Sequence, residues 1–350
     1  MTAATIPSSP SAGYANLDPD RVLRTLEALG LRGDGRLLPL NSYENRVVQV
    51  FLEDGDVVVA KFYRPARWSD AQILEEHAFA RELAADDVPV VAPRVLSTGA
   101  EVQGLELIGQ PPTLARWHDD TALHRVAVSD RHAGRAPELE DTTALQWLGR
   151  FLGRLHAVGS RQPFAHRRTM DPATFGHAAR QRLLDGGFVP DTELPLWTSW
   201  CDAALARVDR AFAQHASAPR LRLHGDFHPG NIMWRDEGPH VVDLDDACNG
   251  PAVQDLWMLL SGDAESMRAQ LVHILAGYRV FRRFDDSELA LIEPLRTLRM
   301  IHHSAWIAER WTDPAFPAAF PWFGSAAYWS QQATQLREQV EAMAEPPLSA

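Results

Sequence analysis

One stretch of the chain restricts its fold and chemistry more than any other. Residues 223–234 read LHGDFHPGNIMW. Pro229 and Gly230 force a tight turn, because both residue types favour turn conformations. Asp226 and Asn231 flank this turn, so the two side chains can face one cavity from its two ends. The stretch therefore predicts a loop that presents a carboxylate and an amide together.

A short β-hairpin is expected directly after this turn. Residues 232–234 and 240–242 are apolar runs, and the turn-forming sequence RDEGP separates them at 235–239. Asn231 precedes the first run and Asp243 follows the second. Because the two strands of a hairpin run in opposite directions, these two polar residues are expected at the same end of it.

An Asp, an Asn and a second Asp in this order are the polar groups that phosphoryl transfer from Mg·ATP requires. One carboxylate takes or orients the proton of the acceptor hydroxyl, while an amide oxygen and a second carboxylate hold Mg²⁺ against the phosphates. We assign Asp226 as the catalytic base, and Asn231 and Asp243 as Mg²⁺ ligands. The alternative is a surface loop with solvated Asp and Asn, which are ordinary turn residues, but the combined pattern is far more restrictive.

These motifs resemble those of a known superfamily. The HGDxHxGN pattern at 224–231 and the Val-Asp pair at 242–243 are similar to elements of the aminoglycoside phosphotransferase and choline kinase superfamily, which shares the protein-kinase fold. Further segments resemble the bacterial stress response kinases, which are serine/threonine protein kinases: LNSYENR at 40–46, KFYRP at 61–65, DLDDA at 243–247 and NGPAVQDLW at 249–257. The resemblance runs from about residue 17 to about residue 348.

The resemblance implies an α+β, two-lobe fold of the protein-kinase type, with an antiparallel β-sheet in the N-lobe and a mainly helical C-lobe. We expect a flexible N-terminus over residues 1–16, a nucleotide-binding N-lobe over 17–130, and a helical C-lobe over 131–350 that carries the catalytic loop and the acceptor site. A chain of 350 residues, 45% of them hydrophobic, can bury a core large enough for this plan.

The resemblance also assigns nucleotide contacts to the N-lobe. The turn at 41–45 has no GxGxxG, yet its backbone N–H groups and the Ser42 hydroxyl can approach phosphate oxygens; a plain hairpin turn is the alternative. Lys61 stands in VAKF, close to the VAIK of protein kinases, and is assigned to the α- and β-phosphates rather than to a solvated surface. Backbone groups near Val128 and Asp130 are expected to meet the adenine.

A helix expected from about residue 69 to residue 85 carries two adjacent acids. Glu75 and Glu76 point about 100° apart, so only one of them can face Lys61. Glu76 falls on the apolar face of the helix, whereas Glu75 would be solvated. We therefore predict that Glu76 pairs with Lys61 and orients it.

The sequence after the second Asp departs from a typical protein kinase. Only residues 247–252 separate Asp243-Leu244-Asp245-Asp246 from the next helix, where a protein kinase has a long activation segment, and Gly225 replaces the Arg of H-R-D. We therefore predict constitutive activity without loop phosphorylation. Asp245 is either a ligand of a second Mg²⁺ or a solvated turn acid. Asp255 is expected to tie down the backbone of the catalytic loop.

A helix expected within residues 289–311 carries five polar residues that form either an acceptor wall or a partly solvated helix face. They are Glu293, Arg296, Arg299, His302 and His303. Two other residues are given structural interpretations. His156 is predicted to be a packed histidine rather than a ligand, and Cys248 is predicted to be an inert thiol rather than a redox sensor.

Composition excludes several functional classes. A formal charge of −12 argues against broad binding to nucleic acids or membrane surfaces, which need basic patches. No signal peptide and no apolar run of about 20 residues is evident, so we expect a soluble, cytoplasmic monomer. The predicted activity is transfer from ATP to Ser/Thr on a protein in a bacterial stress response. The alternatives are a kinase for an aminoglycoside, amino alcohol or sugar, and a catalytically dead pseudokinase that acts by binding.

Overall fold

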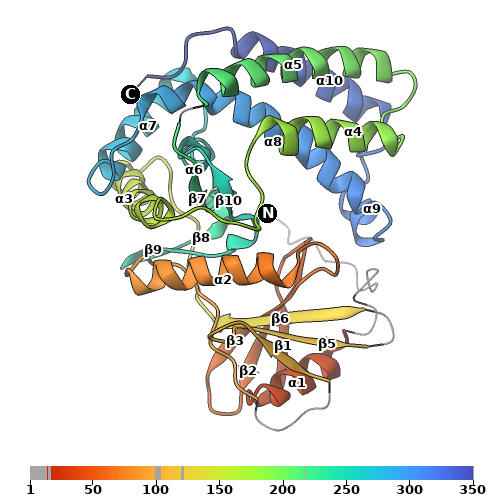
Figure 1. Cartoon of the computed structure of the whole chain (residues 1–350), viewed down its shortest axis with the longest axis vertical. Coiled ribbons are helices and arrows are strands. Elements are labelled where there is room, and N and C mark those ends of the chain that lie inside the picture. Colours follow the sequence, from red (N-terminus) through yellow and green to blue (C-terminus); the bar gives the residue numbers. More distant parts are fainter. Residues whose placement is uncertain (1–13, 15–16, 99–103, 120–121, 217, 350) are drawn as a thin grey trace. The chain divides into compact units, whose positions relative to one another are not determined.

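The computed structural model describes residues 14, 17–98, 104–119, 122–216 and 218–349 (Figure 1). The chain divides into two compact units. The N-terminal unit comprises Met1–Gly134, His240–Asp245 and Asp313–Ala318, and the C-terminal unit comprises Arg135–Pro239, Asp246–Thr312 and Ala319–Ala350. The segment 1–16, predicted to be flexible, lies outside the described residues except for Tyr14. The predicted boundary between residues 130 and 131 stays a prediction.

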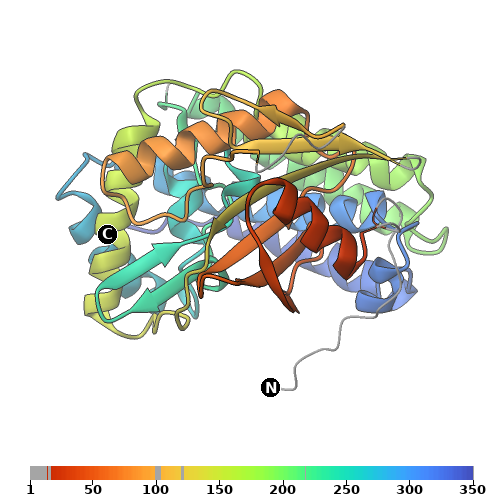
Figure 2. The ribbon, with the colours of Figure 1, turned by 90° about the horizontal axis from the view of Figure 1, so that it is seen from below.

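The N-terminal unit is built on a six-stranded antiparallel sheet with the strand order β1-β2-β3-β6-β5-β4. Its elements are α1 (Pro19–Ala28), β1 (Gly33–Pro39), β2 (Arg46–Leu52), β3 (Val57–Phe62), α2 (Asp70–Ala85), β4 (Glu106–Ile108), β5 (Leu114–His118) and β6 (Leu123–Asp130). Successive side chains of a strand point to opposite faces, and both faces of this sheet are covered. Val126 and Val128 of β6 pack in one cluster with α1, whereas Ala127 packs in a second cluster with Ile73 of α2. Figure 2 shows α1 (red) lying across the strands on its face of the sheet.

Helix α2 begins where its sequence predicts. Ser69 caps the helix, since its Oγ accepts a hydrogen bond from the Gln72 backbone N–H at 3.3 Å and the Gln72 side chain accepts one from the Ser69 N–H. This reciprocal capping box satisfies two backbone donors that the first helical turn leaves unpaired. It fixes the start of the helix that carries Glu76.

The C-terminal unit is mainly helical. Its helices are α3 (Thr142–Gly159), α4 (Ala178–Asp185), α5 (Leu194–Gln214), α6 (Val253–Trp257), α7 (Ala264–Tyr278), α8 (Ile292–Glu309) and α10 (Ala326–Ala342); the short α9 (Ala315–Ala319) spans the division between the units. A π-helical turn, Pro172–His177, precedes α4, and 3-10 turns occupy Pro229–Asn231 and Asp286–Leu291; the 3-10 turn Leu244–Asp246 spans the division between the units. The strand β7 (Leu221–Leu223) pairs antiparallel with β10 (Cys248–Gly250), and β8 (Ile232–Arg235) pairs with β9 (Gly238–Val241). The predicted hairpin after the catalytic turn is therefore confirmed.

Helices α3 and α7 pack backbone against backbone through glycines. A Cβ atom added at Gly149 of α3 would lie 2.0 Å from the carbonyl oxygen of Ile274, and one at Gly277 of α7 would lie 2.1 Å from that of Gln146. The phenyl ring of Phe151, also on α3, stacks on that of Phe227 with 5.5 Å between the ring centroids. The pair of helices thus supports the loop that carries Asp226.

The antiparallel N-terminal sheet and the helical C-terminal part confirm the predicted α+β fold. Among the described helices, none combines the length and the apolar character that crossing a bilayer requires.

Candidate active site

The loop predicted to be catalytic is closed by hydrogen bonds among its own residues. The Asn231 side-chain Nδ2 donates to the backbone carbonyl of Asp226 at 3.0 Å, and the His228 ring Nδ1 accepts from the Gly230 N–H at 3.0 Å. These bonds hold the turn Pro229–Asn231. Because the Asn231 amide nitrogen is used within the loop, its Oδ1 is the atom suited to bind a cation.

Buried Asp255 of α6 anchors this loop from within the C-terminal unit. Its Oδ2 accepts from the His224 N–H at 2.9 Å and its Oδ1 from the Gly225 N–H at 2.9 Å. The His156 Nε2 lies 3.0 Å from Oδ2, and the other nitrogen of this ring lies 3.0 Å from the Tyr278 hydroxyl. The predicted roles of Asp255, as the anchor of the loop backbone, and of His156, as a packed histidine, are confirmed.

The replacement of the H-R-D arginine by Gly225 has a steric reason. Gly225 has a φ of +84°, and an added Cβ would lie 2.3 Å from the carbonyl oxygen of Asp246. Its own carbonyl accepts a bond from the Gln254 Nε2 at 2.9 Å. A side chain at position 225 would therefore collide with the Asp246 backbone and strain the loop.

Asp226 is held ionised by two basic neighbours. The Arg299 Nη1 donates to its Oδ1 at 2.6 Å, and the His228 Nε2 lies 3.4 Å from its Oδ2. Burial raises the pKa of Asp226, but the hydrogen bond from His228 and the charge of Arg299 outweigh burial and hold this pKa well below its usual range. The carboxylate is thus ready to accept a hydrogen bond from a hydroxyl.

The five polar residues of α8 have separate surroundings, and their role as an acceptor wall stays a prediction. Arg299 contacts Asp226, and His303, one helical turn further on, stacks on the Trp306 indole with 5.6 Å between centroids. Arg296 instead pairs with Glu293 at 3.1 Å and lies over the Trp257 ring. His302 packs on Phe175, and burial, followed by the charge of Arg168, lowers its pKa to about 3. Of these five residues, Arg299 contacts Asp226 directly, and the charge of Asp226 acts on His303.

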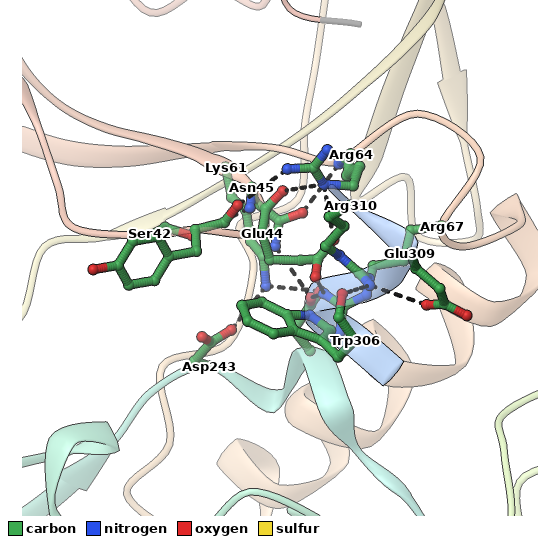
Figure 3. Close-up of polar contacts among 12 residues, drawn as sticks. Ser42, Glu44, Asn45, Lys61, Arg64, Arg67, Asp243, Trp306, Glu309 and Arg310 are labelled. Carbon is green, nitrogen blue, oxygen red and sulfur yellow. Dashed lines mark hydrogen bonds and ion pairs between the residues drawn. The ribbon is translucent and has the colours of Figure 1, made fainter. Parts of the chain in front are cut away.

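In the N-terminal unit, Lys61 contacts two carboxylates, of which Figure 3 labels Asp243. Its Nζ is 3.1 Å from the Asp243 Oδ1, 3.0 Å from the Asp245 Oδ1 and 5.2 Å from the centre of the Tyr63 ring. Burial lowers the pKa of Lys61, but the charges of Asp245 and Asp243 outweigh it and raise this pKa well above its usual value. With its side chain 19% exposed, Lys61 is a partly buried cation rather than a solvated surface residue.

Asp245 is a buried ion-pair centre, so its interpretation as a solvated turn acid is wrong. Its side chain is 4% exposed. Its Oδ2 accepts from the Asn45 Nδ2 at 3.1 Å and from the Arg67 Nη1, in addition to the contact of Oδ1 with Lys61. The Asn45 Oδ1 also accepts from the Arg64 backbone N–H at 3.0 Å. Sequence reasoning missed the roles of Arg64 and Arg67, although they lie only three and six positions after Lys61.

Two more predicted residues have defined surroundings. Glu76 is 6% exposed, accepts from the Tyr63 hydroxyl at 3.5 Å, and contributes to the raised pKa of Lys61, whereas Glu75 is only half-buried. The choice of Glu76 as the inward acid is supported, and its ion pair with Lys61 stays a prediction. The Ser42 Oγ accepts from the Asn45 N–H at 3.2 Å, so this hydroxyl shapes the turn at 41–45.

The residues predicted to meet the adenine lie in β6. The Val128 carbonyl accepts from the Arg94 N–H at 2.7 Å within the N-terminal unit. The Asp130 Oδ1 accepts from the Arg94 Nε at 2.5 Å at the end of the strand. Contact of either residue with adenine stays a prediction.

The predicted Mg²⁺ ligands offer oxygen atoms, which this cation prefers. Asp243 has a side chain that is 52% exposed and a φ of +63°, an unusual conformation for a residue with a side chain. It belongs to the N-terminal unit, whereas Asn231 belongs to the C-terminal unit. Within the described ranges, no three His, Cys, Asp or Glu side chains are grouped as metal ligands. The predicted set of one amide and two carboxylates fits an ion that ATP phosphates also bind.

Cys248 fits the predicted inert thiol. The residue is 1% exposed, and burial raises the pKa of its thiol. A buried thiol that stays protonated is a poor nucleophile.

Comparison with known proteins identifies the family. The model of the phosphotransferase enzyme family matches residues 36–292. Stress response kinase A of Escherichia coli (strain K12) is 42% identical over 339 residues, and the serine/threonine protein kinase RdoA of Salmonella typhimurium is 42% identical over 335 residues; each alignment covers 96% of both chains.

Solved structures share the fold at lower identity. Amicoumacin kinase in complex with AMP-PNP and Ca²⁺ is 19% identical, with a TM-score of 0.68 over 95% of both chains. A microcompartment-associated aminopropanol kinase is 18% identical, with a TM-score of 0.67 over 93% of this chain and 98% of that one. With a family model that matches most of its length and relatives aligned almost from end to end, the chain belongs to the phosphotransferase enzyme family and is a kinase.

Proposed function

We propose that this kinase is an ATP- and Mg²⁺-dependent serine/threonine protein kinase that acts in a bacterial stress response, as a cytoplasmic monomer. The observation that best supports the proposal is that Asp226 is ionised and lies on a loop whose backbone is anchored by Asp255. The choice of a protein acceptor rests on the relatives named as stress response and serine/threonine protein kinases.

The proposed reaction joins the acceptor hydroxyl to the γ-phosphorus of ATP. The acceptor oxygen forms a bond to phosphorus, the bond from phosphorus to the bridging oxygen breaks, ADP leaves, and the hydroxyl proton passes to Asp226. Because the pKa of Asp226 is held low, this carboxylate is a weak base. Its main part is to orient the hydroxyl, and the proton moves late, once the oxygen has begun to bond to phosphorus.

Residues of both units have proposed roles in binding Mg·ATP. Asn231 and Asp243 would hold Mg²⁺, which neutralises phosphate charge, and Asp245 is a further candidate ligand whose oxygens already contact Lys61, Arg67 and Asn45. Contacts to the nucleotide are proposed for Lys61 at the phosphates, Glu76 behind Lys61, Ser42 at the γ-phosphate, and Val128 and Asp130 at the adenine.

A small-molecule kinase is the second candidate, and one feature of the chain favours it. After the turn Leu244–Asp246 the chain enters β10 at Cys248 and α6 at Val253, so the segment 247–252 has no room for a long activation segment that would bind a peptide. The amicoumacin and aminopropanol kinases are named for small substrates. At 18–19% identity they show the fold alone.

A labelling experiment separates these candidates. The purified protein is incubated with Mg²⁺ and γ-labelled ATP, alone, with an acidic and a basic substrate protein, and with a panel of aminoglycosides and amino alcohols, beside Asp226→Asn. Label on Ser or Thr of a protein, absent with Asp226→Asn, is expected. Label confined to a small molecule would reject the protein-kinase proposal. A cellular phenotype that Asp226→Asn leaves unchanged would instead indicate a binding module.

A further inference from the structure

We propose that Arg299, with His303 beside it, forms a subsite for an anionic group on the acceptor, and that Arg299 moves from Asp226 to this group when the acceptor binds. The inference rests on the proposed function, because it needs Asp226 to face the acceptor hydroxyl. It assigns the acceptor a carboxylate close to its hydroxyl, as in a Ser or Thr flanked by acidic residues.

The ion pair at Asp226 is the first step of the argument. The Arg299 Nη1 donates to the Asp226 Oδ1 at 2.6 Å, and the His228 ring lies 3.4 Å from Oδ2. Both oxygens of the catalytic carboxylate thus face basic groups. An acceptor hydroxyl that binds Asp226 must displace or share the hydrogen bond from Arg299, which leaves a guanidinium beside the acceptor.

The exposure of the two partners makes such an exchange feasible. The Arg299 side chain is 44% exposed and that of Asp226 is 24% exposed. Ion pairs at this level of exposure contribute little to stability, because water screens them. An acceptor carboxylate can therefore replace Asp226 as the partner of Arg299 at small cost, and a bidentate arginine–carboxylate pair adds directional hydrogen bonds.

His303 on α8 adds a hydrogen-bond donor beside Arg299 without adding a second positive charge. Arg299 and His303 are four residues apart on the helix, so their side chains are neighbours. Burial, followed by the charge of Arg299, lowers the pKa of His303, which is therefore neutral at pH 7. Its ring stacks on Trp306 and meets the edge of Phe320 at 6.4 Å between centroids. One cation and one neutral N–H donor together suit a carboxylate.

The charge of Arg299 itself also argues about the acceptor. Ammonium groups of aminoglycosides or amino alcohols would meet like charge beside Arg299, which is unfavourable.

Peptide kinetics tests the subsite directly. Three peptides share one Ser and differ only in flanking Glu, Gln or Lys, and kcat/KM is measured for each with Mg·ATP. For the wild type we expect kcat/KM for the Glu peptide to be about tenfold or more higher than that for the Gln peptide, because one charged hydrogen bond can contribute that much. In Arg299→Gln, kcat/KM for the Glu peptide should fall to the value for the Gln peptide. In Arg299→Glu, kcat/KM should be highest for the Lys peptide.

A matched control and two small acceptors complete the test. Arg337→Gln removes an arginine of equal exposure, 44%, that pairs with Glu341 on α10, and it should keep the preference for Glu. Glyceric acid and aminopropanol, offered in place of peptide, carry a hydroxyl beside a carboxylate and beside an ammonium group. We expect glyceric acid to be the better acceptor of the two.

The outcomes distinguish the inference from the proposed function. If the wild type labels all three peptides equally, or if Arg299→Gln lowers the rate equally for all three, the protein kinase is supported and the subsite is rejected. Label on glyceric acid but on no peptide would support the subsite and reject the protein acceptor. Preference for aminopropanol or an aminoglycoside, or no label on any acceptor, would reject both.

Discussion

Removal of the Asp255 charge is expected to destabilise the catalytic loop. In the wild type each oxygen of Asp255 accepts from one backbone N–H group, that of His224 or that of Gly225. In Asp255→Asn only one oxygen remains, so one of these N–H groups faces an NH₂ group and loses its acceptor. The variant also loses the charged partner of the buried His156. One lost charge-assisted bond and one unsatisfied buried donor cost about 3 to 5 kcal/mol together.

Two measurements check this magnitude. Urea unfolding should show a loss of about 3 to 5 kcal/mol in the free energy of unfolding, and hydrogen exchange should show faster exchange of the amides of His224 and Gly225. Asp209→Asn is the matched control, because Asp209 is a half-exposed acid that pairs with His177, and it should change stability by less than about 1 kcal/mol.

A contrary result would be clear. If Asp255→Asn unfolds with the wild-type free energy and retains both amide protection and turnover, Asp255 does not anchor the loop. If stability falls while the two amides keep their protection, the lost stability arises elsewhere in α6 and the assignment of the bond network is wrong.

Three further predictions follow from the geometry of the same loop. Gly225→Ala is expected to cost at least about 1–3 kcal/mol and most of the activity, because φ is +84° and the added Cβ meets the Asp246 carbonyl; thermal unfolding and labelling check this. Phosphatase treatment should leave the rate unchanged, since 247–252 is too short for an activation segment, and a lasting loss of rate would contradict this. Arg299→Gln should move the acid limb of the kcat profile to higher pH, because the pKa of Asp226 rises when this cation is removed; an unmoved limb would show that Asp226 does not set it.

Local pattern was sufficient to predict much of the site. The Pro-Gly turn, the apolar runs after it and the helical spacing around Glu76 each depend on residues close together in the chain. Such features follow from backbone preferences and from the periods of helix and strand. They yielded the hairpin and the start of α2.

The contacts that sequence reasoning missed join residues far apart in the chain. Arg299 lies 73 positions from Asp226, and Arg67 lies 178 positions from Asp245. No periodicity links such pairs, so a single sequence shows the charges but not their partners. Asp245 in DLDD appeared equally suited to metal or solvent, and only its burial beside Arg67 excludes solvent.

Burial separates the roles of the two carboxylates that contact Lys61. Asp245 is 4% exposed, and a carboxylate so buried is tolerable only with full compensation. Arg67, Lys61 and the Asn45 amide supply it. Asp243 contacts the same ammonium group but is 52% exposed, so water already solvates much of its charge. Exchange of Lys61 for another cation therefore costs less at Asp243 than at Asp245, which favours Asp243 over Asp245 as the proposed Mg²⁺ ligand.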